Sequence, residues 1–167
     1  MAKSSSEKGG GKNAAEGGGI LIVAQNKRAR HDYEIMQTAE CGIVLSGPEV
    51  KSIRDGHMNL KESYVQVHGG EVFLIGCNIK PYAHSRLEEQ DADRERKLLM
   101  HRREIERLAV QVNQKGLTIV PLKAYFKAGR CKVEIGIGRG KKLHDKRDDL
   151  KRREADREMA RAMKYRS

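Results

Sequence analysis

Two segments of this 167-residue chain alternate apolar and polar residues on both sides of a glycine-containing turn. The first, YVQVHGGEVFLI at residues 64–75, contains the pair Gly69-Gly70, which accepts the positive φ of a two-residue hairpin turn. The second, LTIVPLKAYFKAGRCKVEIGIG at residues 117–138, turns at Ala128-Gly129. Alternation with a period of two places successive side chains on opposite faces of a strand. Both segments therefore predict antiparallel hairpins, and Lys132 is expected to point to solvent.

Other segments predict further strands and a short helix. The apolar run ILIVA at residues 20–24 is strand-like, and a second strand is expected to end at Leu45, before a turn at Ser46-Gly47. Pro48 at a first helical position and Gly56 as a stop then predict a helix of about two turns.

A longer helix is predicted from Asp93 to Lys115. Apolar residues recur there at spacings of three and four, and Gly116 follows as a C-terminal cap. Short strands joined by hairpins, with one short and one longer helix, predict a mainly β domain. Its modest size fits a small β-barrel of the OB type with flanking α-helices.

Both ends of the chain lack a recognisable core. Residues 1–19 are mostly Gly, Ser, Lys and Ala and cannot recover the entropy of ordering, so we expect them to be disordered. Residues 139–167 contain 12 Lys or Arg and 6 Asp or Glu, without the apolar stripe of a docked helix. We therefore expect a disordered N-terminal tail (1–19), an OB-type domain (20–138) and a flexible basic C-terminal tail (139–167).

The net charge of the chain favours a polyanionic partner. Lys and Arg number 34 against 23 Asp and Glu, a formal net charge of +11, which is typical of proteins that bind nucleic acids or membrane surfaces. A membrane partner is disfavoured because the longest apolar run is ILIVA and tryptophan is absent. No apolar segment of a secretory signal follows the first charges, so we expect a cytoplasmic protein.

Motifs for catalysis, cofactors or metals are not found. The segment GIGRGKK fails the P-loop spacing, and the six histidines follow none of the common metal-site patterns. The three cysteines, Cys41, Cys77 and Cys131, are widely spaced and are expected to be buried thiols rather than disulfide or zinc partners. We expect a non-enzymatic protein without cofactor or metal.

Two basic segments are candidates for RNA contacts. NKRARHDY, which begins at Asn26, offers an amide, three cations, an imidazole and an aromatic ring, although such a cluster can also serve solubility alone. A second cationic strip contains Lys132, Lys141 and Lys142, on or after a strand of the same domain. Two cationic segments in one small β domain favour RNA over a merely solvated surface.

Six motifs, taken in order, resemble the bacterial SsrA-binding protein (small protein B) family. They are NKRARHDYEI, GPEVKSIRDG, ESYVQV, RKLLMHRREIERL, KGLTIVPLKAYFKAG and KVEIGIGRGKKLHDKR, within a match from about Asn26 to Glu154. The resemblance implies an OB-type barrel that binds transfer-messenger RNA, the SsrA RNA, through its tRNA-like domain. It also implies delivery of this RNA to stalled ribosomes for trans-translation, tagging of the nascent chain and ribosome rescue.

Further partners follow from the same resemblance. They are the decoding centre and mRNA channel of the small ribosomal subunit, where the C-terminal tail becomes helical, and elongation factor Tu with the alanyl-charged RNA. A monomer is expected. The competing hypotheses are a structural ribosomal RNA-binding protein and an enzyme acting on RNA.

Residue roles are carried over by position in this sequence. The expected RNA-binding residues are Asn26, Lys27, Arg28, Arg30, His31, Glu40, Leu99, His101, Lys132, Lys141 and Lys142. Glu40 is expected to accept hydrogen bonds from base or ribose, with a surface salt bridge to Arg28 or Arg30 as the alternative. His101 replaces an asparagine frequent in the family, and an imidazole can still donate or stack. The expected decoding-centre and mRNA-channel residues are His144, Asp145, Lys146, Arg147, Lys151, Arg152 and Arg153.

Overall fold

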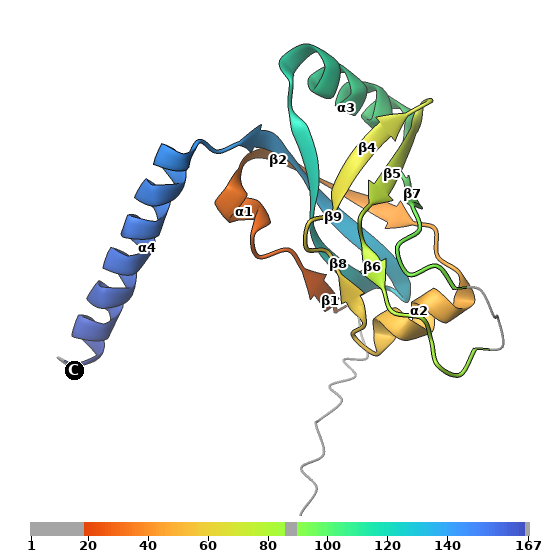
Figure 1. Ribbon diagram of the computed structural model, residues 1–167, viewed down its shortest axis with the longest axis horizontal. Coiled ribbons are helices and arrows are strands. Elements are labelled where there is room, and N and C mark those ends of the chain that lie inside the picture. Colours follow the sequence, from red (N-terminus) through yellow and green to blue (C-terminus); the bar gives the residue numbers. More distant parts are fainter. Residues whose placement is uncertain (1–18, 86–89, 166–167) are drawn as a thin grey trace, which may run out of the picture.

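The computed structural model describes residues 19–85 and 90–165 (Figure 1). The strands are β1 (Leu21–Gln25), β2 (Tyr33–Ile43), β3 (Met58–Asn59), β4 (Tyr64–His68), β5 (Glu71–Ile75), β6 (Asn78–Ile79), β7 (Arg96–Leu99), β8 (Thr118–Lys127) and β9 (Arg130–Gly140). The helices are α1 (Ala29–Asp32), α2 (Gly47–Arg54), α3 (Arg102–Lys115) and α4 (Leu143–Lys164). The expected disordered tail lies, except for residue 19, outside the described residues.

The antiparallel sheet closes into a near-barrel. Its order is β1-β8-β4-β5-β7-β2-β9, and β8 also pairs with β9, so the strands from β8 to β9 form a ring. β1 and β4 share one edge of β8, because β1 pairs with residues 123–126 and β4 pairs at Ile119. With four helices in the described residues, this near-barrel gives a mixed α/β architecture.

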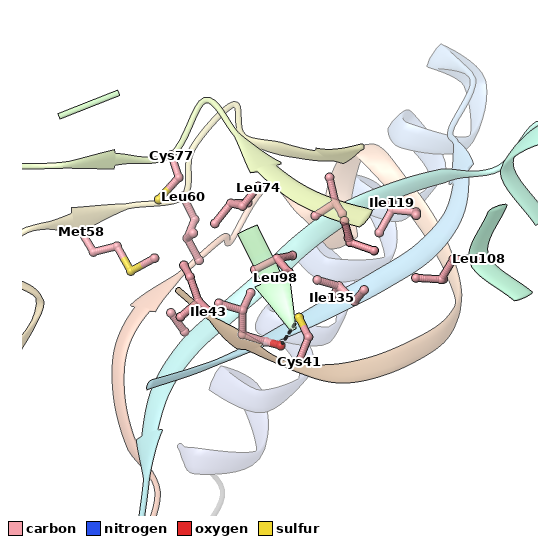
Figure 2. Close-up of a cluster of buried hydrophobic side chains, with 14 of the residues drawn as sticks. Cys41, Ile43, Met58, Leu60, Leu74, Cys77, Leu98, Leu108, Ile119 and Ile135 are labelled. Carbon is pink, nitrogen blue, oxygen red and sulfur yellow. Dashed lines mark hydrogen bonds between the residues drawn. The ribbon is translucent and has the colours of Figure 1, made fainter. Parts of the chain in front are cut away.

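Both predicted hairpins are confirmed. β4 and β5 turn at Gly69-Gly70, where both φ values are positive, and β8 and β9 turn at Ala128-Gly129, again with positive φ. Apolar side chains of the alternating strands point into the ring and form one continuous core, part of which is shown in Figure 2. Its most deeply buried members include Val72, Leu74, Val133 and Ile135.

The short helix α2 also agrees with the sequence analysis. Ser46 caps its first turn, since the Ser46 hydroxyl accepts from the Glu49 backbone N–H and the Glu49 carboxylate accepts from the Ser46 N–H. Pro48 lies in the first turn, and Gly56 beyond the end has a φ of +83°.

The helix expected from Asp93 begins only at Arg102, and this correction has a clear cause. Residues Arg96 to Leu99 instead form β7, which pairs with β5 and β2 and so closes the ring. Arg96 and Leu98 point inward, as alternate residues of a strand do. In the sequence, the spacing between Leu98 and Ile105 favoured a helix instead. The predicted C-terminal cap is confirmed, since Gly116 ends α3 in the left-handed conformation.

A buried ion-pair network holds β7 and α2 together. The Arg96 side chain is fully buried and donates to Glu49 Oε1 and to the carbonyl oxygens of Ala92, Arg94 and Cys77, at 2.7–3.0 Å. Arg94 binds the other oxygen of Glu49 at 2.6 Å. The two arginines therefore fix the chain between β6 and β7 against α2.

Glycine allows a close crossing on the outer face of β9. A Cβ on Gly138 would lie 1.9 Å from the Glu34 carbonyl oxygen, so this position requires glycine for β2 to approach. Beside it, Ala29, Val120 and Leu122 form a second small cluster, with Tyr33 and Ile35 packed against it. This cluster seats α1 on the outside of the ring.

Helix α4 projects away from the ring and carries the C-terminus at its far end (Figure 1). None of its residues is buried. The tail expected to be able to form a helix is thus helical here, although β9 continues to Gly140, two residues past the expected domain boundary.

Candidate nucleic-acid interface

Four of the residues selected from the sequence line one groove of about 400 Å³. Glu40 comes from β2, Leu99 from β7, His101 from the N-cap of α3 and Lys132 from β9. Gly42, Met100 and Glu104 complete its wall. The fold therefore brings together residues that are up to 92 positions apart in the chain.

Strand register explains how the groove forms. Gly42 lies opposite Lys132 on one side and opposite Leu99 on the other, so a residue without a side chain separates a cation from an apolar side chain. A Cβ at Gly42 would lie 3.2 Å from the Leu99 Cβ and would crowd it. Leu99 remains 52% exposed, which leaves it available to a partner.

Glu40 is held as a carboxylate by its neighbours. The Tyr125 hydroxyl donates a hydrogen bond to Glu40 Oε2, and Lys127 Nζ lies 3.6 Å from the same oxygen. The Tyr125 hydrogen bond, helped by the charges of Lys127 and Lys132, holds the pKa of Glu40 below its ordinary value against a smaller desolvation effect. The alternative pairing of Glu40 with Arg28 or Arg30 is not observed, because its partners lie on β8.

Tyr125 and Lys127 were missed by the sequence reasoning. A bulge in β8 between Pro121 and Lys123 shifts the alternation, after which Tyr125 lies opposite Lys132. The spacing of Lys123, Tyr125 and Lys127 could have revealed this outward face. Tyr125 itself is buried, and its pKa is raised chiefly by burial and then by the hydrogen bond to Glu40.

The basic loop before and within α1 lies on a different part of the surface. Lys27, Arg28 and Arg30 are exposed, and His31 is half-buried. Asn26 is tied to β8, since its backbone N–H donates to the Leu122 carbonyl at 2.8 Å and its side-chain Nδ2 donates to the Pro121 carbonyl at 3.1 Å. Its amide therefore anchors the loop that presents the cations.

A hollow of about 420 Å³ adjoins this loop. Asn26 and Arg28 line it together with Lys61 and Tyr64, which the sequence reasoning did not select. Lys61 lies in the turn before β4 and Tyr64 begins that strand, so only the fold brings them to the loop.

The base of α4 is fastened to α1. The Lys141 backbone N–H donates to the Asp32 carbonyl at 2.8 Å, and Lys141 Nζ donates to the Arg30 carbonyl at 3.0 Å and to the Asp149 carboxylate. Asp32 also receives His31 Nδ1 at 3.0 Å and Lys146 Nζ at 3.4 Å. Lys141 and Lys146 are thus engaged within the protein, while Lys142, the N-cap of α4, is exposed.

The remaining tail residues face solvent. The His144 side chain is 83% exposed, and its Nδ1 lies 3.2 Å from Asp148, one turn further along α4. The other exposed residues selected on this helix are Asp145, Arg147, Lys151, Arg152 and Arg153. The structure therefore separates the groove, the α1 loop and the α4 residues into three surfaces.

The cysteines are built into the fold. Cys41 and Cys77 are buried and Cys131 is half-buried, all as free thiols. Burial raises the pKa of Cys41 to about 12 and that of Cys77 to about 11, which keeps these thiols protonated and unreactive. The expectation of structural thiols is confirmed, with Cys131 less buried than expected.

Within residues 19–85 and 90–165, no three His, Cys, Asp or Glu side chains are grouped closely enough to hold a metal ion. In the same residues, no helix has the length and apolar character needed to cross a membrane.

A closed antiparallel sheet with flanking helices, exposed cations in the α1 loop and on α4, and a net charge of +11 define a small α/β protein of the kind that binds polyanions. Comparison with protein families gives the particular family. The family described as SmpB protein matches residues 23–165, and this chain belongs to it.

Curated relatives are close and similar in length. The chain is 57% identical over 146 residues to the SsrA-binding protein of Microcystis aeruginosa, covering 87% of this chain and 95% of that protein. It is 55% identical over 148 residues to the SsrA-binding protein of Syntrophotalea carbinolica, covering 89% and 99%.

A solved structure is also similar. A chain from the work "tmRNA-SmpB: a journey to the center of the bacterial ribosome" superposes with a TM-score of 0.60 at 47% identity, covering 74% of this chain and 85% of that chain. Membership of this family agrees with the expectation of an RNA-binding protein that is not an enzyme.

Proposed function

We propose that this protein binds transfer-messenger RNA, the SsrA RNA, and delivers it to stalled ribosomes for trans-translation. It acts as an adaptor without catalysis, so that the nascent chain is tagged and the ribosome is rescued. The observation that carries the proposal is the groove in which Glu40, Leu99, His101 and Lys132 meet. The names of the relatives and of the solved complex support the identity of the RNA.

Each groove residue has a chemical task in this proposal. Lys132 supplies a positive charge for phosphate, and Leu99 supplies an apolar surface for an unstacked base. Glu40, kept ionised by Tyr125, accepts hydrogen bonds from a base edge or a 2′-hydroxyl, which phosphate cannot donate. His101 donates to the RNA or stacks on it.

The α1 loop adds contacts that depend on charge. Lys27, Arg28 and Arg30 are exposed and bind phosphates of the tRNA-like domain. His31 contributes a donor, and Asn26 holds the loop in place. Of the two lysines that follow β9, Lys142 is free to reach RNA, whereas Lys141 first has to leave Asp149.

The α4 residues serve the ribosome in this proposal. His144 reaches the decoding centre of the small subunit, while Asp145, Lys146, Arg147, Lys151, Arg152 and Arg153 contact the mRNA channel. A helix with no buried residue in the protein itself supports a partner outside the chain. We infer that the helix described above is the form that the tail takes on the ribosome and that the tail is flexible before it binds.

The proposal includes the finer organisation of the molecule. The ring is a small barrel of the OB type spanning residues 20–138, between a disordered N-terminal tail (1–19) and the C-terminal tail (139–167). The protein works in the cytoplasm as a monomer, together with elongation factor Tu and the alanyl-charged RNA.

Replacement of Glu40 tests the groove. Glu40→Gln makes the protein less acidic and so favours nonspecific attraction to RNA, yet we expect affinity for transfer-messenger RNA to fall roughly tenfold to a hundredfold. That range corresponds to about 1.5–3 kcal/mol for a hydrogen bond to a charged group. Filter binding with the transcribed RNA measures it.

Glu134→Gln is the matched control. Glu134 lies directly opposite Glu40 on β9, pairs with Lys123 at 3.2 Å and does not line the groove. The two variants have the same charge. If Glu40→Gln binds the RNA as tightly as Glu134→Gln does, the groove is not the RNA site.

A further inference from the structure

The outer face of α3 carries cations that lack partners in the fold. Arg103 and Arg107 are exposed, and among the described residues neither has a carboxylate within 4.0 Å. Arg102, by contrast, pairs with Glu106 at 3.4 Å. Arginines at positions i and i+4 on a helix are neighbours that repel one another, so leaving both unpaired costs stability that a partner could recover.

These side chains point away from the core. Leu108, on the opposite side of α3, is buried, whereas Val110 is 47% exposed. Arg103, Arg107, Val110 and Lys115 line a shallow hollow of about 580 Å³ on the helix surface, with Glu106 as its single acid. The hollow is therefore cationic with one small apolar side chain.

The hollow and the groove are neighbours along α3, although no residue lines both. Glu104, next to Arg103, lines the groove, and His101 at its edge is the N-cap of α3. On the same side of the helix, Gln111 Nε2 donates to Gln37 Oε1 at 3.0 Å. Gln37 lies three residues before Glu40 on β2, so its side chain leaves the opposite face of that strand; the bridge fastens α3 to β2, and the groove and the hollow meet only along α3.

We propose that the outer face of α3 binds the phosphate backbone of the same RNA that occupies the groove, through Arg103 and Arg107. The inference rests on the proposed function and extends its binding surface beyond the residues selected from the sequence. A guanidinium presents a rigid fork of donors that matches phosphate oxygens in pairs. A membrane would need bulkier apolar anchors than Val110.

Salt dependence of RNA binding tests the assignment. Each phosphate contact changes the slope of log affinity against log salt by about 0.7 to 0.9, a factor of roughly 5 to 8 at 0.1 M salt. We therefore expect Arg103→Gln with Arg107→Gln to weaken binding of transfer-messenger RNA roughly 25- to 60-fold at 0.1 M salt. The slope should become shallower by about 1.4 to 1.8.

The control is Lys51→Gln with Lys80→Gln, which removes the same charge at exposed positions on α2 and after β6. Figure 1 shows α2 at the end of the ring opposite to α3. Slopes that fall equally in the two double variants would overturn the proposal, because the effect would then be one of net charge. An unchanged affinity in the α3 variant would overturn it as well.

Two further measurements separate this inference from the proposed function. If Lys132→Gln weakens binding while the α3 variant does not, only the α3 proposal fails; if neither changes affinity, the RNA site as a whole is wrong. If the α3 variant binds the RNA normally but associates less with purified ribosomes, α3 serves a ribosomal partner, and the proposal is overturned.

Discussion

The ring of strands and helix α4 differ in whether their charged side chains are buried. In the ring, Arg96 is completely buried and every polar atom of its guanidinium reaches Glu49 or a carbonyl oxygen. In α4, charged residues dominate 22 positions and none is buried. The Arg96 network is therefore completed within the folded ring and α2, whereas α4 contacts the rest of the described chain at its base, through α1.

This difference in burial determines how much ion pairs contribute to the stability of each region. A buried pair is strongly coupled to the fold, because loss of one partner leaves an uncompensated charge in a medium of low dielectric. Exposed pairs of opposite charge at positions i and i+4 of a helix contribute only a few tenths of a kcal/mol. The ring thus holds its buried charges within its own packing, while every residue of α4 remains open to its surroundings.

The largest effect is expected in the ring, from Arg96→Met. The variant removes the Arg96 donors from the carbonyl oxygens of Cys77 and Arg94 and removes one partner of Glu49, so the free energy of unfolding should fall by about 3–5 kcal/mol. Arg94→Met, at a side chain 36% exposed, should cost about 1 kcal/mol. Urea denaturation measures both, and equal losses would contradict the contrast between the fully buried Arg96 and the partly exposed Arg94, which share Glu49.

In α4, a proline should abolish function without unfolding the ring. Lys151→Pro costs about 3 kcal/mol in a helix interior, so tagging of nascent chains on stalled ribosomes should be lost. The urea midpoint of the ring and the affinity for transfer-messenger RNA should match those of Lys151→Ala, which removes the same charge. Normal tagging by Lys151→Pro would exclude a helical tail. A loss of RNA affinity as large as the loss of tagging would show that RNA binding is not made by the ring alone.

The smallest effect concerns the pKa of Glu40. Because the Tyr125 hydroxyl is the largest cause of its lowered pKa, Tyr125→Phe should raise the pKa of Glu40 toward 4.5, and Lys127→Ala should raise it less. A carboxyl whose pKa is lowered by folding adds stability above its unfolded pKa and loses it as pH falls through the folded pKa. NMR titration of the Glu40 carboxyl carbon measures the shift, and an unchanged pKa in Tyr125→Phe would refute the hydrogen bond.

Local signals predicted much of the fold. The glycine-containing turns Gly69-Gly70 and Ala128-Gly129 placed both hairpins, and Ser46 with Pro48 placed α2, because these features depend on a few neighbouring residues. β7 could not be found this way. Its four residues become a strand because β5 and β2 each offer it an edge, which is a property of the closed ring.

The site was predicted in part, and for a similar reason. Resemblance to the family selected Glu40, Leu99, His101 and Lys132, and the fold brings these four together. It did not select Tyr125, whose position depends on a bulge in β8. Nor did it reveal that Lys141 is already engaged, because Asp149 and the Arg30 carbonyl reach it only in the folded chain.

The short connection between the ring and α4 sets a geometric limit on the tail. Only Lys141 and Lys142 separate β9 from the helix, and 22 helical residues extend about 33 Å. Because Lys141 and Lys146 hold the base of α4 against α1, its far end lies about that distance from the ring, and the short link keeps its effective concentration near a site at this reach in the millimolar range. The length of the helix therefore limits the receptor: one whose two sites lie farther apart than α4 can reach cannot bind the ring and the tail at the same time.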